Sequence, residues 1–175
     1  MVAKPLNKAV ERMLRVDQAG EYGAVRIYAG QMAVMGDRGP HAGRIAHMAE
    51  QELVHRQWFD DFLTQRGGRP TLLQPIWHVA GFALGAATAL IGPEAAMACT
   101  AAIETEIDRH YTQQLEELGQ DEPEIADKIA RARDEEREHR DTAFEHGAEK
   151  APAYPLLSGA IRLGCRVAIA LTERI

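Results

Sequence analysis

The sequence contains two copies of one short motif, a glutamate followed three residues later by a histidine. On a helix, residues three apart lie on one face, so each copy sets a carboxylate beside an imidazole. Each copy also has a lone glutamate upstream, and the two upstream intervals differ by only one residue. The complete set is Glu21, Glu52, His55, Glu104, Glu136 and His139. We interpret the two halves as an internal duplication that carries four carboxylates and two imidazoles.

The same offset, to within one residue, relates two further pairs. Tyr28 matches Tyr111 in the second half, and Arg56 matches Arg140. Each tyrosine follows a lone glutamate by seven residues, which places it on the same helix face. We expect the tyrosines either to contact the carboxylates or a substrate pocket, or to pack in the core. We expect the two arginines to be solvated, with pairing to carboxylates as the alternative.

Composition favours one all-α domain over residues 1–175. The chain is 46% hydrophobic and only 6% aromatic, and long stretches lack proline and β-branched runs. A net charge of −6 with interleaved signs argues against binding to nucleic acid. Two cysteines are too few for a disulfide framework or a thiolate metal site, so we expect free core thiols. The segment Met1 to Arg15 lacks the apolar core of a signal peptide, which predicts a cytoplasmic protein.

Turn signals at residues 36–40 and 119–123 divide the helical pattern into two hairpins. The expected helices run from about Leu6 to Met35, His41 to Gln65, Pro93 to Leu118 and Glu124 to His146. The first contains Gly20, Gly23 and Gly30, each costing roughly 1 kcal/mol relative to alanine in a helix. These glycines predict close helix approach or access for a ligand.

Two further segments are strongly apolar. No charged residue occurs from Pro70 to Pro93, and the clean part runs from Ile76 to Gly92. Because this part is shorter than the roughly 20 residues of a membrane-spanning helix, we expect a crossover helix buried in the bundle or lying in a membrane interface. The C-terminal segment predicts an amphipathic helix that either caps the bundle or rests on lipid. Its apolar stripe is Leu157, Ala160, Ile161, Gly164, Ala168 and Leu171.

The turns place the four glutamates at one height. Glu21 and Glu52 lie almost equally far before and after Asp37, so both are roughly 23 Å from the turn at about 1.5 Å per residue. In the second half, Glu104 and Glu136 lie equally far before and after Gln120. Two such hairpins joined by a long crossover predict a ferritin-like four-helix bundle, in which this set of side chains binds two iron or manganese ions.

Metal binding also explains why four carboxylates would be buried. Two divalent ions would neutralise them, and oxygen and nitrogen ligands without thiolate fit iron or manganese better than structural zinc. We assign Glu21, Glu52 and His55 to one iron and Glu104, Glu136 and His139 to the other, with Glu52 and Glu136 bridging. Open positions on two ferrous ions would allow dioxygen to be reduced and one oxygen atom inserted into an organic substrate. Four other glutamates are expected on the surface: Glu50, Glu106, Glu135 and Glu138.

Four stretches resemble the demethoxyubiquinone hydroxylase family of ubiquinone biosynthesis. They are residues 16–24 (VDQAGEYGA), 26–31 (RIYAGQ), 81–86 (GFALGA) and 164–169 (GCRVAI). The resemblance implies a di-iron monooxygenase that uses O2 to hydroxylate the ring of 2-polyprenyl-3-methyl-6-methoxy-1,4-benzoquinol. The family's metal ligands fall on the six residues above, and its His-Tyr pair falls on His110 and Tyr111, which implies a catalytic role for both.

The resemblance also implies partners and a location. A bacterial member would be a peripheral protein on the cytoplasmic face of the cell membrane, with the isoprenoid tail of the substrate near its apolar segments. The electrons would come from an external donor, either diffusible, a protein or a reduced substrate, and other ubiquinone-biosynthesis proteins are further expected partners. The alternatives are a ferritin-like or rubrerythrin-like protein that handles iron or peroxide, a manganese catalase, and a metal-free bundle that recruits partners to membranes.

Overall fold

A computed structural model describes residues 7–37 and 39–175 as a bundle of α-helices without a strand among these residues. The helices are α1 (Lys8–Met35), α2 (Ala42–Arg66), α3 (Gln74–Ile91), α4 (Pro93–Leu118), α5 (Pro123–Glu145) and α6 (Tyr154–Thr172), with a 3-10 turn at Ala148–Lys150. The predicted all-α fold is confirmed. Observed helix ends fall within two residues of the expected ones, apart from the expected start at Leu6, which lies outside the described residues.

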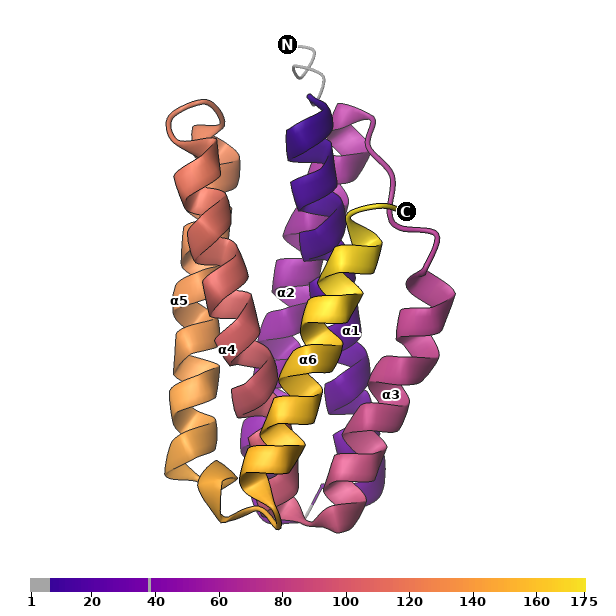
Figure 1. Cartoon of the computed structure of the whole chain (residues 1–175), viewed down its shortest axis with the longest axis vertical. Helices are drawn as coiled ribbons and strands as arrows, with labels where there is room; N and C mark the ends of the chain where they lie inside the picture. Colours follow the sequence, from indigo (N-terminus) through magenta and orange to yellow (C-terminus); the bar gives the residue numbers. More distant parts are fainter. Residues whose placement is uncertain (1–6, 38) are drawn as a thin grey trace.

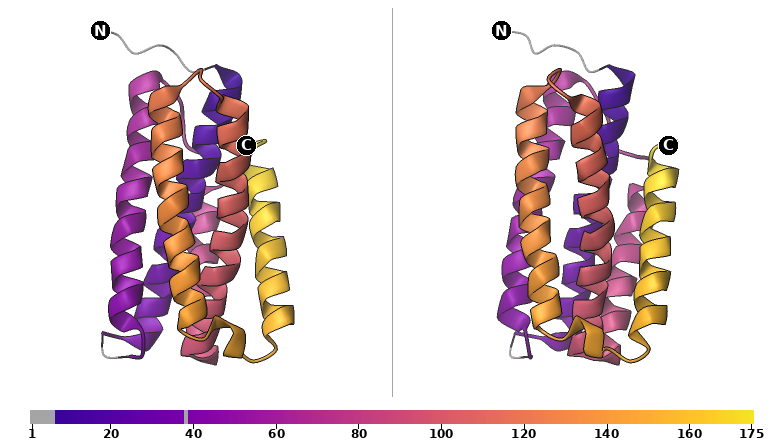
Figure 2. Two further views of the ribbon diagram at one scale, coloured as in Figure 1. Left: turned by 90° about the vertical axis from the view of Figure 1, so that its left-hand side faces the viewer. Right: turned by 60° about the vertical axis from the view of Figure 1, so that its left-hand side comes forward.

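The helices form two hairpins joined by a crossover. α1 packs against α2 and α4 against α5, while α3 connects the two hairpins in sequence and packs along the outside of α1 (Figure 1). α6 lies outside the four-helix core and packs on α4, as both views of Figure 2 show. This is the ferritin-like arrangement that the duplicated motif predicts.

Local sequence explains where several of the helices begin and end. Asn7 caps α1, because its side-chain oxygen accepts a hydrogen bond from the backbone N–H of Val10 at 2.9 Å. α1 and α2 end at Gly36 and Gly67, which adopt φ values of 67° and 76° that favour glycine. α5 begins with Pro123, a residue suited to the first helical position. The helix lengths, and therefore the height of each glutamate, are set by these signals.

Glycines allow α1 and α3 to touch along their backbones. A Cβ added at Gly85 would lie 1.9 Å from the carbonyl oxygen of Ile27, and one at Gly30 would lie 2.2 Å from that of Phe82. Only glycine, whose side chain is a single hydrogen atom, allows the two helix backbones to approach this closely. The prediction of close approach is therefore confirmed at Gly30.

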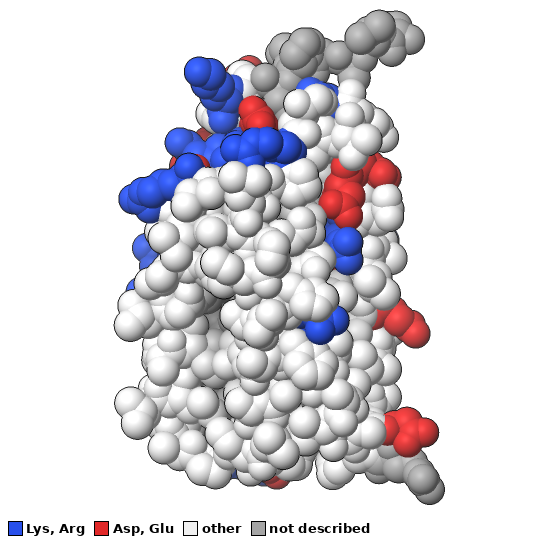
Figure 3. All heavy atoms as spheres, turned by 90° about the vertical axis from the view of Figure 1, so that its right-hand side faces the viewer, with Lys and Arg blue, Asp and Glu red and all other residues white. Residues whose placement is uncertain are grey.

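α3 and α6 leave much apolar surface exposed. Both are long and apolar enough to cross a membrane, and few of their residues are buried. The alternative of a crossover helix buried in the bundle is wrong, because only Gly81, Gly85, Thr88 and Ala89 of α3 are buried. Figure 3 shows the side of the molecule on which α3 lies as a broad uncharged surface bordered by charged side chains.

Only part of the predicted stripe on α6 is covered by the bundle, since Ala160, Gly164 and Leu171 are exposed. Ile161 is buried with Ile27 and Cys99, while the exposed apolar side chains of α6 include Leu163 and Val167. The helix is therefore apolar on both sides, which a single stripe did not predict.

The apolar core has two main parts at opposite ends of the bundle. One contains Tyr28, Ile45 and Met97, and the other contains Leu14 and Phe59. The polar side chains described below lie between these two parts.

Candidate metal centre

The six predicted ligands meet in the middle of the four-helix core. All are buried, with exposures of 0 to 3%. They form two overlapping groups in which one oxygen or nitrogen atom of each residue lies within 4.8 Å of the others. The His55 group contains Glu21, Glu52, His55 and Glu136, and the His139 group contains Glu52, Glu104, Glu136 and His139. Either group could hold a metal ion, and Glu52 and Glu136 belong to both, in keeping with the bridging positions that we predict for them.

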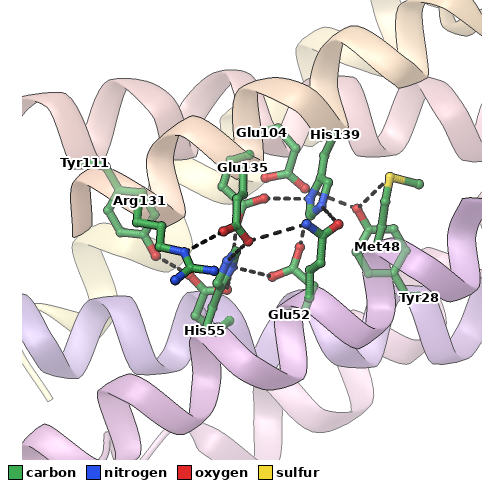
Figure 4. Close-up of polar contacts among 12 residues, drawn as sticks. Tyr28, Met48, Glu52, His55, Glu104, Tyr111, Arg131, Glu135 and His139 are labelled. Atoms are coloured by element: carbon green, nitrogen blue, oxygen red, sulfur yellow. Dashed lines mark hydrogen bonds and ion pairs between the residues drawn. The ribbon is translucent and has the colours of Figure 1, made fainter. Parts of the chain in front are cut away.

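Each of the four core helices contributes to the cluster. α1 and α4 supply one glutamate each, and α2 and α5 supply one motif each. Figure 4 shows that Glu52 and His55 of α2 and His139 of α5 point toward one another from facing helices. The duplicated sequence thus produces a nearly symmetrical site.

Several buried atoms in the cluster make no hydrogen bond. Both carboxylate oxygens of Glu52 and of Glu136, and the Nδ1 atoms of His55 and His139, are in this state among the described residues. These Nδ1 atoms lie 2.9 and 2.8 Å from carboxylate oxygens of Glu136. Buried polar atoms normally have partners. Oxygen and imidazole nitrogen atoms that converge in this way, in contact with one another, fit a pair of metal ions.

The electrostatics of the cluster are those of crowded, buried acids. Burial, reinforced by the charge of Glu136, raises the pKa values of Glu52 and Glu104 well above the usual range. Burial would also raise the pKa of Glu136, but the adjacent His139 and His55 outweigh it and lower that pKa to about 2. Burial opposes the charge on His55, yet its contacts with Glu136 and Glu21 raise its pKa to about 11. The metal-free cluster therefore holds protons where a metal would carry positive charge.

The two duplicated tyrosines contact the cluster crosswise. The hydroxyl of Tyr111 donates a hydrogen bond to Glu21 of the other half, and that of Tyr28 donates to Glu104 at 3.4 Å. Both tyrosines are buried. Of the two roles we considered, contact with the carboxylates is therefore present, alongside core packing.

An apolar cavity of about 530 Å³ lies beside the cluster, between α1, α3, α4 and α6. Gly20 and Gly23 form part of its wall, as expected for glycines that give access to a ligand. Tyr111 also lines the cavity, so one side chain contacts both the cavity and the cluster. The cavity is large enough for a small organic ring.

Two polar side chains of the cavity wall, Asp17 and His110, contact Gln114, which lies outside the wall. His110 was expected, but Asp17 and Gln114 were missed. Asp17 Oδ1 accepts a hydrogen bond from Gln114 Nε2 at 2.7 Å and lies 3.3 Å from His110 Nε2. Burial raises the pKa of Asp17. Asp17 could have been identified from the sequence by its spacing of four residues from Glu21, because this spacing places both carboxylates on one face of α1.

Two glutamates predicted on the surface are placed differently. Glu106 is buried, and one of its oxygens lies 2.6 Å from Nε of Arg162 on α6. Glu135 is partly buried and its Oε2 lies 2.9 Å from Nε2 of His55. These two predictions were wrong because the partners come from distant parts of the chain. Glu50 and Glu138 are exposed as predicted.

The two duplicated arginines and the two cysteines were also considered in the sequence. Arg140 pairs with Asp108 of α4 at 3.0 Å, whereas Arg56 pairs within its own helix with Asp60 at 3.3 Å. Both arginine side chains are still partly exposed. The two cysteines are free, Cys99 buried and Cys165 partly so.

Comparison with known proteins identifies the relatives of this chain. The family model described as ubiquinone biosynthesis protein COQ7 matches residues 8–172. The 3-demethoxyubiquinol 3-hydroxylase of Rhodospirillum rubrum is 56% identical over 95% of this chain and 78% of its own length. The mitochondrial NADPH-dependent 3-demethoxyubiquinone 3-hydroxylase of Homo sapiens is 51% identical over 95% of this chain and 78% of its own. The chain therefore belongs to the COQ7 family of ubiquinone biosynthesis proteins.

Proposed function

We propose that this protein is a di-iron monooxygenase that hydroxylates the ring of 2-polyprenyl-3-methyl-6-methoxy-1,4-benzoquinol with O2. The observation that carries the proposal is the junction between the buried Glu/His cluster and the apolar cavity, made by the Tyr111–Glu21 hydrogen bond. The names of the relatives give the substrate class and the reaction. They do not favour the alternative of iron storage or peroxide handling.

The His55 group and the His139 group would hold one iron each and share Glu52 and Glu136. When bound, the iron pair supplies the two-electron reduction of O2 and the transfer of one oxygen atom to the ring. The protein supplies a site that is dry and already assembled, since the cluster is buried between two apolar parts of the core. Neutralising the charge of the four carboxylates would be the main electrostatic contribution of the metals.

The cavity would bind the quinol ring next to Tyr111. Its apolar wall suits a methylated ring and the first part of an isoprenoid tail, and excludes water from the reaction. Tyr111 can hold or move a proton between the cavity and Glu21, and His110 with Asp17 can orient a ring oxygen or exchange protons with it. We therefore propose Tyr111 and His110 as the catalytic side chains that contact substrate.

An external reductant would supply two electrons in each turnover. The human relative is named NADPH-dependent. Of the three kinds of donor expected from the sequence, that name favours a diffusible nicotinamide.

Two variants distinguish a loss of metal binding from a loss of catalysis. Glu52→Gln removes a carboxylate shared by both groups, so we expect loss of both iron and hydroxylation. Tyr111→Phe keeps the ring but removes the hydroxyl, so we expect bound iron to be unchanged and hydroxylation to fall about tenfold or more. Iron is measured on the purified protein, and the product is identified by mass after anaerobic reduction and addition of quinol and O2. Full activity of Glu52→Gln would refute the site.

We further propose that the exposed apolar side chains of α3 and α6 rest on the cytoplasmic face of the cell membrane. Val79 and Leu163 are 67% and 59% exposed, and both helices border the cavity that would accept the substrate tail. Val79→Asp and Leu163→Asp should release the protein from liposomes without loss of iron. Val54→Asp, on α2 and 48% exposed, is the control and should bind liposomes as the parent does. Retention of both α3 and α6 variants on liposomes would contradict this docking surface.

A further inference from the structure

The two histidines of the metal centre differ in what their outer nitrogen contacts. Both turn Nδ1 toward the cluster, where it lies within 2.9 Å of Glu136. Nε2 of His55 lies 2.9 Å from a carboxylate oxygen of Glu135, whereas Nε2 of His139 lies 2.9 Å from the amide oxygen of Gln51. One imidazole thus has an anionic partner and the other a neutral one.

Gln51 and Glu135 occupy the same position in the two duplicated halves. Each directly precedes the glutamate of its motif, so the offset between them is that of the motifs themselves. Each contacts the histidine of the opposite half. Each half therefore supplies a side chain that contacts Nε2 of the opposite histidine. The two side chains differ by one charge, since one is the neutral Gln51 and the other is the anionic Glu135.

The contacts form a continuous hydrogen-bonded chain. Gln51 Nε2 donates to Glu135 Oε2 at 3.4 Å, which leaves the amide oxygen of Gln51 to accept from Nε2 of His139. Glu135 accepts from Nε2 of His55 through the same oxygen, and its other oxygen accepts from Nε of Arg131 at 2.9 Å. Both histidines are held with a hydrogen on Nε2, so Nδ1 is the nitrogen that faces the cluster and would bind a metal in place of a proton.

Arg131 does not cancel the charge of Glu135. Its side chain is 64% exposed, while that of Glu135 is 21% exposed and that of His55 is fully buried. An exposed ion pair is weakened by water. The carboxylate therefore acts on His55 from closer range and with less screening than the guanidinium does.

We propose that Glu135 and Gln51 make the two metal positions unequal, so that the His55 group binds the first metal ion and the His139 group the second. A hydrogen bond to an anion increases the electron density of an imidazole and the donor strength of its other nitrogen, and a neutral amide does so much less. Such outer partners typically change metal affinity by about 10 to 100-fold. The inference rests on the proposed function, since it assumes that the cluster binds two metals. Glu135 and Gln51 are positioning residues that act through the histidines.

The test uses Co²⁺ as a spectroscopic probe on anaerobic, metal-free protein, at one equivalent per chain. His139→Ala and His55→Ala provide reference spectra for the His55 group and the His139 group alone. The parent should match the His139→Ala reference. The exchanged variant Gln51→Glu/Glu135→Gln has the same composition and net charge, and should match the His55→Ala reference instead.

Single substitutions provide a second measurement in case a reference variant binds poorly. Glu135→Gln should weaken binding of the first Co²⁺ about tenfold. Glu138→Gln, an exposed position on the same helix, makes the same charge change outside the hydrogen-bonded chain and should leave binding unchanged. If Glu135→Gln binds the first Co²⁺ as tightly as the parent, or the exchanged variant fills the His55 group first, the inference is overturned while the metal centre stands. A parent that binds no Co²⁺ would overturn the metal centre itself.

Discussion

Gly85→Ala should destabilise the protein by opening the contact between α1 and α3. The added Cβ would lie 1.9 Å from the carbonyl oxygen of Ile27, whereas ordinary contact begins at 3.4 Å, so the helices would have to separate by more than an ångström. No side-chain rotation can relieve the clash because the neighbour is backbone. Overpacking of this kind costs about 3 kcal/mol at the upper end of its usual range. The gain in helix propensity returns about 1 kcal/mol, which leaves a net loss of about 2 kcal/mol.

Thermal unfolding of parent and variant in the same metal state measures this effect. A loss of about 2 kcal/mol should lower the melting temperature by roughly 4 to 8 °C for a chain of this size. Gly159→Ala is the matched control, because Gly159 lies in the exposed part of α6 and an added Cβ would meet no atom within 4 Å. It should be as stable as the parent or slightly more stable. A Gly85→Ala protein that melts at or above the parent temperature would refute the close contact.

Two further predictions concern buried charge. Arg162→Ala should destabilise the protein by about 2 kcal/mol and expose α6 to proteases, because it leaves the buried Glu106 carboxylate without its nearest partner. Glu106→Gln removes the buried charge itself and should cost only about 1 kcal/mol. Equal losses of stability in the two variants would contradict this prediction. Burial opposes the charge on His55, but contacts with Glu136 and Glu21 raise its pKa to about 11, so this imidazole carries a proton that a metal must displace. Binding of divalent metal should therefore release protons at pH 7 and weaken as pH falls from 8 to 6. A metal titration in weak buffer with a pH indicator checks the release, and pH-independent affinity would argue against it.

The sequence allowed the fold and the cluster to be predicted because both depend on short-range spacing. The interval of three residues places Glu52 and His55 on one face, and turn glycines such as Gly36 set the height of each helix. The duplication doubled this signal.

The outer contacts could not be predicted in the same way. Glu106 and Glu135 find partners 56 and 80 residues away, on helices whose rotation about their own axes is not fixed by local sequence. A glutamate in a charged helix is also usually solvated, so the general expectation pointed to the surface. The exposed apolar side of α6, which includes Leu163 and Val167, was missed for a related reason, since the periodicity was interpreted as a single apolar stripe.

The proposed function requires the iron-loaded cluster to insert oxygen from O2 into a quinol bound in the adjacent cavity. The most direct measurement is a single-turnover reaction of the iron-loaded, anaerobically reduced protein with demethoxy quinol and ¹⁸O₂, followed by mass analysis of the product. We predict a ring hydroxyl that carries ¹⁸O. A product labelled from water instead, or oxidation of the quinol without added oxygen, would contradict the account.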